Sequence, residues 1–123
     1  MPSIESLQYS PRMDVNLTLF DNATHTADTL SSKIDFGVTG GCPESALFIN
    51  VGATNGTTDF EIHTSDDDST YTPLALKIAS VNAAGQYVVL LNNAIVKTRY
   101  MKLNDNLGTA TSVTVTAYLL PDY

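Results

Sequence analysis

The chain has 123 residues, of which 43% are hydrophobic and 15% are charged, and its formal net charge is −7. One domain is expected at this length, and the low charge argues against disorder, which usually combines low hydrophobicity with high charge. The acidic balance argues against direct nucleic-acid binding, because phosphate recognition depends on clustered Lys and Arg side chains.

Cysteine usage and hydropathy narrow the expected location of the protein. Cys42 is the only cysteine, which excludes an intrachain disulfide and with it a disulfide-stapled scaffold. Met1–Ser10 lacks the basic start and apolar run of a signal peptide, and no stretch approaches the roughly 18 apolar residues of a transmembrane helix. We therefore expect a protein that is made in a cytoplasm and has no membrane partner.

The first segment, residues 1–11, is predicted to be an extended arm that precedes a single β domain over residues 12–123. Prolines bracket this arm, and its apolar residues Ile4, Leu7 and Tyr9 follow no clean alternation. Because apolar side chains on an extended segment gain nothing from exposure to water, we expect the arm to dock on another surface.

Downstream of the arm, alternation of apolar and polar residues dominates, and helical periodicity is nearly absent. The clearest case is the last segment, where Val113, Val115, Ala117 and Leu119 occupy every second position. Eight strands are predicted; in chain order they cover Val15–Leu19, Lys33–Phe36, Ala46–Val51, Phe60–His63, Tyr71–Lys77, Tyr87–Leu91, Tyr100–Leu103 and Val113–Leu119.

Turn signals separate these strands. Asn55-Gly56 is the strongest, because this pair readily adopts the positive φ angles of a tight turn, and Ser65–Ser69 is a polar turn. Many short strands without intervening helices predict an all-β fold, an eight-stranded antiparallel β-sandwich of the jelly-roll type. An immunoglobulin-like sandwich is the alternative, although the cysteine pair and Trp of true immunoglobulin domains are absent.

The sequence carries no recognisable catalytic, cofactor or metal motif. His25 and His63 have no Cys or second His at metal-ligand spacing, and both are expected to be exposed. Asp66–Asp68 lacks the alternating ligands, central Gly and distal Glu of an EF-hand loop, so it predicts a solvated hairpin turn. Cys42 has no strongly basic neighbour that would lower its pKa, and is expected to be inert. We therefore predict a protein that is not an enzyme and holds no cofactor or metal.

Two groups of residues are candidates for binding a partner. Lys97, Arg99 and Lys102 hold half of the six cations, and they indicate either a basic patch that faces a partner or a strand edge guarded by charge. The six tyrosines are a modest interface signal, because Tyr is favoured in interface cores, although core or rim packing explains them equally well. Three of them lie near the termini: Tyr9, Tyr118 and Tyr123.

Several segments, taken in order, resemble the jelly-roll capsid cement (decoration) proteins of tailed bacteriophages. Ile4–Ser10 is similar to their amino-terminal arm, and Ile34–Gly37 to a short strand end of apolar-Asp-apolar-Gly pattern. Phe60–Asp67 resembles their strand followed by a Thr-Ser/Asp-Asp turn, and Arg99–Leu103 resembles their strand of the pattern Arg-Tyr-apolar-Lys/Arg-apolar. Thr114–Leu120 is similar to their Thr-rich final strand.

This resemblance implies a structural virion protein on the outer surface of the phage head, made in the bacterial cytoplasm. The expected partners are the major capsid protein, whose subunits it would bridge, and further copies of itself, with a dimer preferred over a trimer. No contact with nucleic acid or membrane is expected. The residues expected to contact partners are Ile4, Leu7, Tyr9, Lys97, Arg99, Tyr118 and Tyr123.

Two other classes of protein stay open at this point. One is a tail- or fibre-associated β-sandwich binding module, with carbohydrate as a candidate ligand, although a sugar platform usually needs the Trp that this chain lacks. The other is a small β-barrel enzyme or cupin-like metal protein, which needs clustered His and Glu; the two histidines here lie on separate segments.

Overall fold

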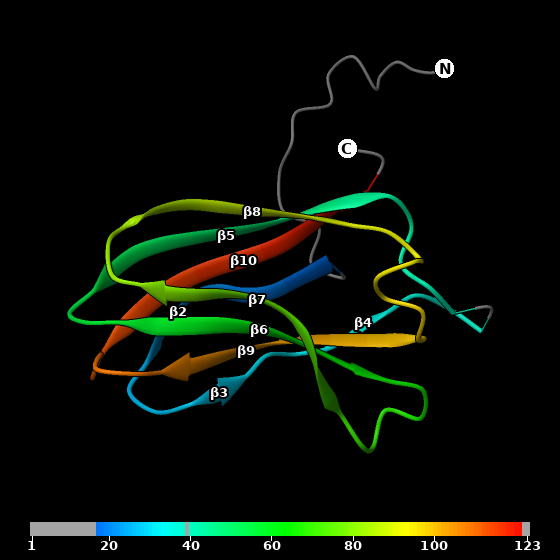
Figure 1. The fold of residues 1–123 in the computed structure, drawn as a ribbon, viewed down its shortest axis with the longest axis horizontal. Helices are drawn as coiled ribbons and strands as arrows, with labels where there is room; N and C mark the ends of the chain where they lie inside the picture. The colour runs from blue at the N-terminus through cyan, green and yellow to red at the C-terminus, as the bar shows by residue number, and fades with distance from the viewer. Residues whose placement is uncertain (1–16, 39, 122–123) are drawn as a thin grey trace, which may run out of the picture.

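The computed structural model describes residues 17–38 and 40–121. This part of the chain contains nine β-strands and no α-helix, and all its strand pairs are antiparallel (Figure 1). The strands are β2 (Thr18–His25), β3 (Thr29–Leu30), β4 (Ile34–Asp35), β5 (Ser45–Thr54), β6 (Thr58–Ser65), β7 (Thr72–Val81), β8 (Gly85–Leu91), β9 (Tyr100–Leu107) and β10 (Val113–Pro121). The predicted arm over residues 1–11 lies outside the described residues.

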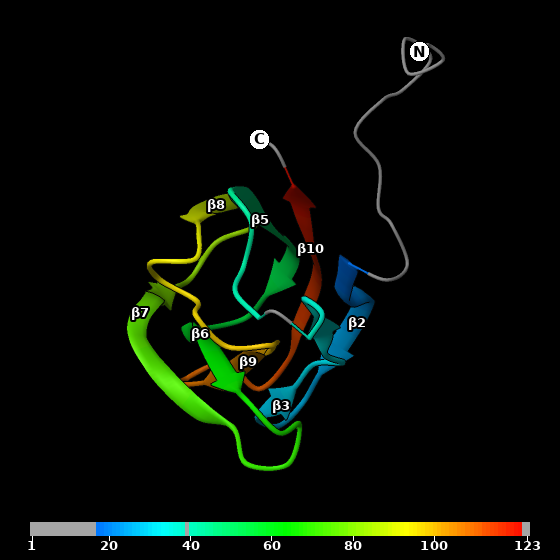
Figure 2. The same ribbon diagram turned by 90° about the vertical axis from the view of Figure 1, so that its right-hand side faces the viewer.

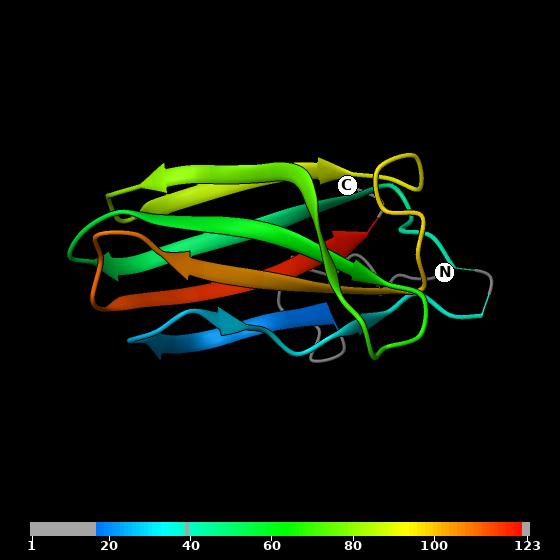
Figure 3. The same ribbon diagram turned by 60° about the horizontal axis from the view of Figure 1, so that its bottom comes forward.

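The strands form two sheets that pack face to face, as the end-on view shows (Figure 2). One sheet has the order β2-β10-β5-β8, and the other has the order β3-β9-β6-β7, with β4 also pairing with β9. The long strands of both layers run along the long direction of the molecule (Figure 3). The sequence-based prediction of an antiparallel, two-layered all-β fold is therefore confirmed.

The strand pairs are nested along the chain. β6 pairs with β7, β5 with β8, β3 and β4 with β9, and β2 with β10, so that each successive pair encloses the one before it. The chain therefore follows the path of one long hairpin whose tip is the β6–β7 connection. Successive pairs of this hairpin fall alternately into the two sheets.

Alternation places the core between the sheets. In β10 the residues Val113, Val115, Ala117 and Leu119 are all nearly inaccessible, whereas the residues between them are partly exposed. β6 shows the same pattern, with Phe60 and Ile62 pointing inward. Side chains of a strand point alternately to its two faces, so a strand with one face against the core shows this period of two.

The predicted segments locate most strands but not all of their ends. β2 continues to His25, well past the predicted end at Leu19, and the short strand Thr29–Leu30 was not predicted. The cause lies in the irregular backbone of β2, whose register against β10 shifts twice and whose Asn22 has a φ of 48°. Bulges of this kind interrupt the alternation on which a sequence-based assignment depends. Within the described residues, no helix is long and apolar enough to cross a membrane.

Candidate binding surface

One end of the outer face of the β2-β10-β5-β8 sheet is apolar. Tyr118 lies opposite Phe48, and Phe48 lies opposite Val88, so these three outward side chains form one row across β10, β5 and β8. The next row is apolar as well. We call the two rows together the apolar face; its members are Ala46, Phe48, Val88, Leu90, Tyr118 and Leu120.

Exposure is uneven over the apolar face. Leu90 is 65% exposed and Val88 is 45% exposed, both on the edge strand β8, whereas Phe48 is only 9% exposed. The rings of Phe48 and Tyr118 stack, with centroids 5.4 Å apart and an interplanar angle of 19°. Exposed Val and Leu side chains beside a pair of stacked aromatic rings are typical of a surface that binds another protein.

The absence of charge extends over three whole strands. None of the residues of β5, β8 and β10 is Asp, Glu, Lys, Arg or His, although the chain contains 19 charged residues when its 13 acidic and 6 basic residues are added. The row beyond the apolar face is polar but uncharged, with Thr116, Asn50 and Gln86 across the three strands. The three neighbouring strands therefore present a neutral surface on a protein of net charge −7.

The outer face of the other sheet has the opposite character. His63 lies opposite Lys102, and Glu61 lies opposite both Asn104 and Lys77, so neighbouring strands present polar and charged side chains to solvent. His63 Nε2 lies 3.4 Å from Glu61 Oε1. This face needs no partner to shield it from water.

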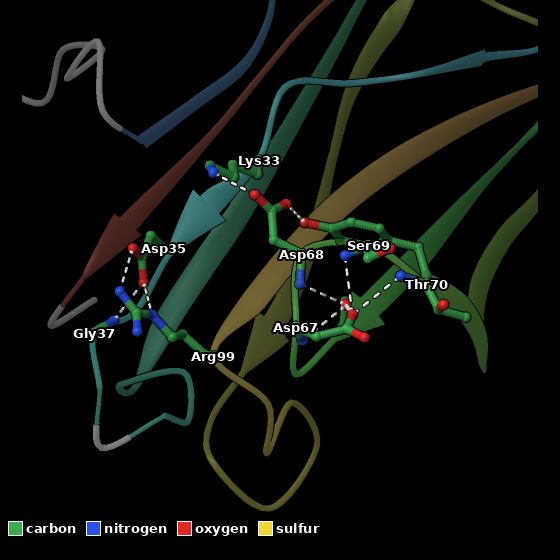
Figure 4. Close-up of polar contacts among 10 residues, drawn as sticks. Lys33, Asp35, Gly37, Asp67, Asp68, Ser69, Thr70 and Arg99 are labelled. Carbon is green, nitrogen blue, oxygen red and sulfur yellow. Dashed lines mark hydrogen bonds and ion pairs between the residues drawn. The ribbon is translucent and has the colours of Figure 1, made fainter.

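Arg99, a predicted contact residue, is held at one end of the molecule by Asp35. Its Nε and Nη2 atoms donate hydrogen bonds of 2.8 and 3.0 Å to the two carboxylate oxygens, and the backbone N–H of Gly37 donates one of 2.8 Å (Figure 4). These hydrogen bonds, that from Arg99 first, lower the pKa of Asp35 to about 2. Arg99 therefore fixes the chain near β4, and its charge is already matched.

A second ion pair lies beside the first. Lys33 pairs with Asp68, and the Tyr71 hydroxyl donates a hydrogen bond to the same carboxylate (Figure 4). The ammonium group of Lys102 lies 4.4 Å from the centroid of the Tyr71 ring. Lys97 is exposed in the connection before β9, and no ion pair joins it to any of the described residues. Lys97, Arg99 and Lys102, which indicated either a basic patch or a guarded strand edge, thus lie in different environments.

The acidic turn around Asp67 is organised by its own backbone. The Asp67 carboxylate accepts hydrogen bonds of 3.0 and 2.9 Å from the N–H groups of Thr70 and Ser69, and a further one from the Ser65 hydroxyl (Figure 4). These bonds lower the pKa of Asp67. Asp67 therefore organises the turn through its Oδ1 atom, and no group of three or more candidate metal ligands occurs among the residues described.

His25 corrects the prediction that both histidines are exposed. It is only 5% exposed, and its Nδ1 lies 2.6 Å from Oδ2 of Asp105, which belongs to the opposite sheet. The hydroxyl of Thr58 donates a hydrogen bond to the other oxygen of Asp105, and both residues are 0% exposed. We call His25, Thr58 and Asp105 the buried polar cluster. Its hydrogen bonds join β2 of one sheet to β6 and β9 of the other.

The pattern around His25 was misleading because β2 is bulged. The flanking stretch Asn22–Thr26 is polar, which favours an exposed loop, yet His25 lies opposite the buried Val113 and therefore points inward. Its ring also packs edge-on against Phe20, with centroids 4.4 Å apart. The sequence contains one signal that Asp105 is buried: the alternation of β9 places it on the side of the strand that faces the core.

The single cysteine is buried in the core. Cys42 is 0% exposed, and burial raises the pKa of its thiol. The sulfur donates a hydrogen bond of 3.2 Å to the Pro43 carbonyl. These observations agree with an unreactive thiol.

Of the predicted contact residues, Tyr118 lies on the apolar face, whereas Lys97 and Arg99 lie at a different part of the surface. Ile4, Leu7, Tyr9 and Tyr123 lie outside the described residues. The apolar side chains of β8 were missed as contact residues, because the segment Tyr87–Leu91 was predicted only to be a strand. The sequence matches no protein-family model and no curated protein.

Proposed function

We propose that this protein is a capsid decoration (cement) protein that binds the outer surface of a bacteriophage head and bridges major capsid protein subunits. The observation that carries the proposal is the apolar face on an otherwise acidic protein. A surface of this kind loses water on contact with another protein, and burial of apolar area is the main favourable term in protein association. The functional surface is therefore an outer face of the sandwich rather than a pocket.

The fold proposed for this role is a jelly roll of eight strands, in which β3 and β4 count as one interrupted strand beside β9. The nested pairing of the strands supports it, because a jelly roll is a long antiparallel hairpin rolled into two sheets. Folds of this type place long, regular strands at the surface, where several of them together form one binding face.

Small contacts suffice for a decoration protein. Many copies bind one shell, and each copy that spans two subunits makes its second contact at a high effective concentration. Because such a protein binds the assembled shell and not the separated subunits, it stabilises the shell by mass action. The net charge of −7 does not oppose this role, since the packaged DNA lies on the other side of the shell wall. Copies are also proposed to associate with one another, as dimers in preference to trimers.

The test uses purified full-length protein and expanded phage shells. We expect co-sedimentation with the shells and a rise in their melting temperature. The double variant Val88→Asp/Leu90→Asp should keep its fold, because both side chains are exposed, but should bind the shells about tenfold to a hundredfold more weakly. Failure of the unmodified protein to bind would overturn the proposal.

A matched control lies on the other sheet. Leu76 is 37% exposed on β7, so Leu76→Asp makes the same chemical change outside the apolar face. We expect this variant to bind shells as the unmodified protein does, and equal losses in both variants would argue against the apolar face as the contact. Deletion of residues 1–11 tests the predicted arm in the same assay, with weaker shell binding as the expected result.

A further inference from the structure

The sandwich has four edge regions, and three of them are protected against pairing with another strand. β2 carries two register shifts and the positive φ of Asn22. β7 carries Pro73, Lys77 and two register shifts against β6. β3 and β4 contain only two residues each. Bulges, prolines, charges and short length are the devices by which proteins prevent edge strands from pairing.

The fourth edge, β8, has none of these devices. All seven of its residues pair with β5 in one unbroken register, from Gly85 opposite Val51 to Leu91 opposite Ser45. Its sequence, GQYVVLL, is uncharged and free of proline, and it is rich in residues that favour strands. Among the described strands β8 pairs with β5 alone, so the N–H and C=O groups along its other side are available to a further strand.

We propose that β8 is a self-association edge, to which β8 of a second copy adds in antiparallel orientation about a two-fold axis. The pairing joins the two β2-β10-β5-β8 sheets into one continuous sheet. An antiparallel strand pair is compatible with two-fold symmetry, because each strand presents the same surface to its partner. This inference deepens the self-association in the proposed function by naming the edge that makes it.

The distribution of charge favours a second copy of this chain as the partner that pairs with the β8 edge. Two molecules of net charge −7 repel each other, and the repulsion is smallest where their charges are most distant. The chain from residue 78 to residue 96, which includes β8 and both its flanking turns, contains no charged residue. A partner attracted by the negative charge of this protein would be basic, and it would bind where the acidic residues lie rather than at β8. The neutral edge instead matches its own neutral, β-prone sequence.

The side chains on β8 fit the same pairing. Val88 and Leu90 point outward from the sheet and are 45% and 65% exposed in the single chain. Across an antiparallel junction they come within reach of the same residues of the second copy, and cross-strand pairs of apolar side chains stabilise a sheet. The junction also places the two apolar faces next to each other on one surface.

Analytical ultracentrifugation of the full chain, without shells, tests the proposal. We expect a dimer, and we expect Leu90→Lys to weaken dimerisation at least about tenfold, because it places a charge on an edge strand that pairs through neutral, largely apolar residues. Val88→Lys makes an independent second disruption on the same strand. Two controls should remain dimeric: Leu76→Lys on the edge of the other sheet, and Tyr118→Glu, which lies on the apolar face but two strands away from the edge.

Hydrogen exchange identifies the edge itself. In the dimer every β8 amide should be protected, whereas in the Leu90→Lys monomer only those that bond to β5 should be. A monomeric unmodified protein would overturn the proposal, as would a dimer that survives both β8 variants. A dimer lost in Tyr118→Glu would indicate face-to-face contact instead. Shell binding by a monomer would refute only the β8 pairing, whereas a β8 dimer that does not bind shells would refute only the decoration function.

Discussion

The buried polar cluster and the apolar face are opposite departures from the usual distribution of side chains. Inside, His25, Thr58 and Asp105 are polar groups in the core, and each finds a hydrogen-bond partner there. Outside, Val88 and Leu90 are apolar groups in water. A buried polar group with a partner is complete within the chain and supports the fold. A contiguous patch of exposed apolar side chains, unlike a single one, gains stability from contact with a second molecule, so it marks a candidate binding surface.

The comparison predicts that substitutions inside act on folding and that substitutions outside act on binding. The two regions share no residue, since the cluster joins β2, β6 and β9 whereas the apolar face covers β10, β5 and β8. Stability and association can therefore be changed separately, which makes each prediction below a test of this separation.

The largest effect is expected from Asp105→Ala. This variant leaves His25 and the Thr58 hydroxyl buried without their shared partner, and breaking a buried pair in this way costs about 3–5 kcal/mol. Urea unfolding followed by circular dichroism measures the loss. Thr58→Val keeps the shape of the side chain but removes the hydroxyl, which donates to Asp105 and to the Asn106 carbonyl, and should cost less, about 1–3 kcal/mol. If Asp105→Ala proved as stable as the parent, the cluster would not be what holds the sheets together at this point.

Two adjacent leucines give the sharpest comparison of inside with outside. Leu91 is 1% exposed, so Leu91→Ala should lower the free energy of unfolding by about 2–5 kcal/mol. Leu90, its neighbour on β8, is 65% exposed, and Leu90→Ala should cost less than about 1 kcal/mol. Leu90→Ala should weaken shell binding and dimerisation, although less than the charged variants do. Equal losses of stability would show that Leu90 packs within its own chain.

Much of the fold could be predicted because strands with one face in the core alternate regularly. β10 was located in this way, since Val113 and the inward residues that follow it occupy every second position. β2 and β7 were predicted incompletely, because bulges shift their side chains between faces and no local pattern marks where a bulge will occur. The connection of the strands depends on contacts between distant segments, which alternation does not specify.

The candidate surface was only partly predictable, for a related reason. The sequence shows that each of β5, β8 and β10 is free of charge, but not that the three are neighbours. Tyr118 was selected as a contact residue for its type alone; its position opposite Phe48 emerges from the pairing of β10 with β5. In the same way, His25 and Asp105 lie 80 positions apart, and only the packing of the two sheets brings them together.

The exposed pair of Asp35 and Arg99 is the surface counterpart of the buried cluster, and it should give the smallest effect. Exposed ion pairs contribute little, because water and salt screen them. The pKa of Asp35 is lowered to about 2 in the folded protein. The contribution of this group to the free energy of unfolding is therefore complete above its unfolded pKa near 3.8 and is lost as the pH falls through about 2. Asp35→Asn should therefore leave the shape of the stability curve unchanged above pH 4 and flatten it slightly between pH 4 and 2.

The remaining acid dependence gives this measurement its internal control. The pKa values of Asp67 and Asp68 are lowered too, and both groups are unchanged in the variant, so part of the slope must persist. Urea unfolding at a series of pH values should show this partial flattening, and high salt should reduce the difference between variant and parent. A loss in Asp35→Asn as large as that in Asp105→Ala would contradict the comparison, because an exposed carboxylate would then contribute as much stability as a buried one.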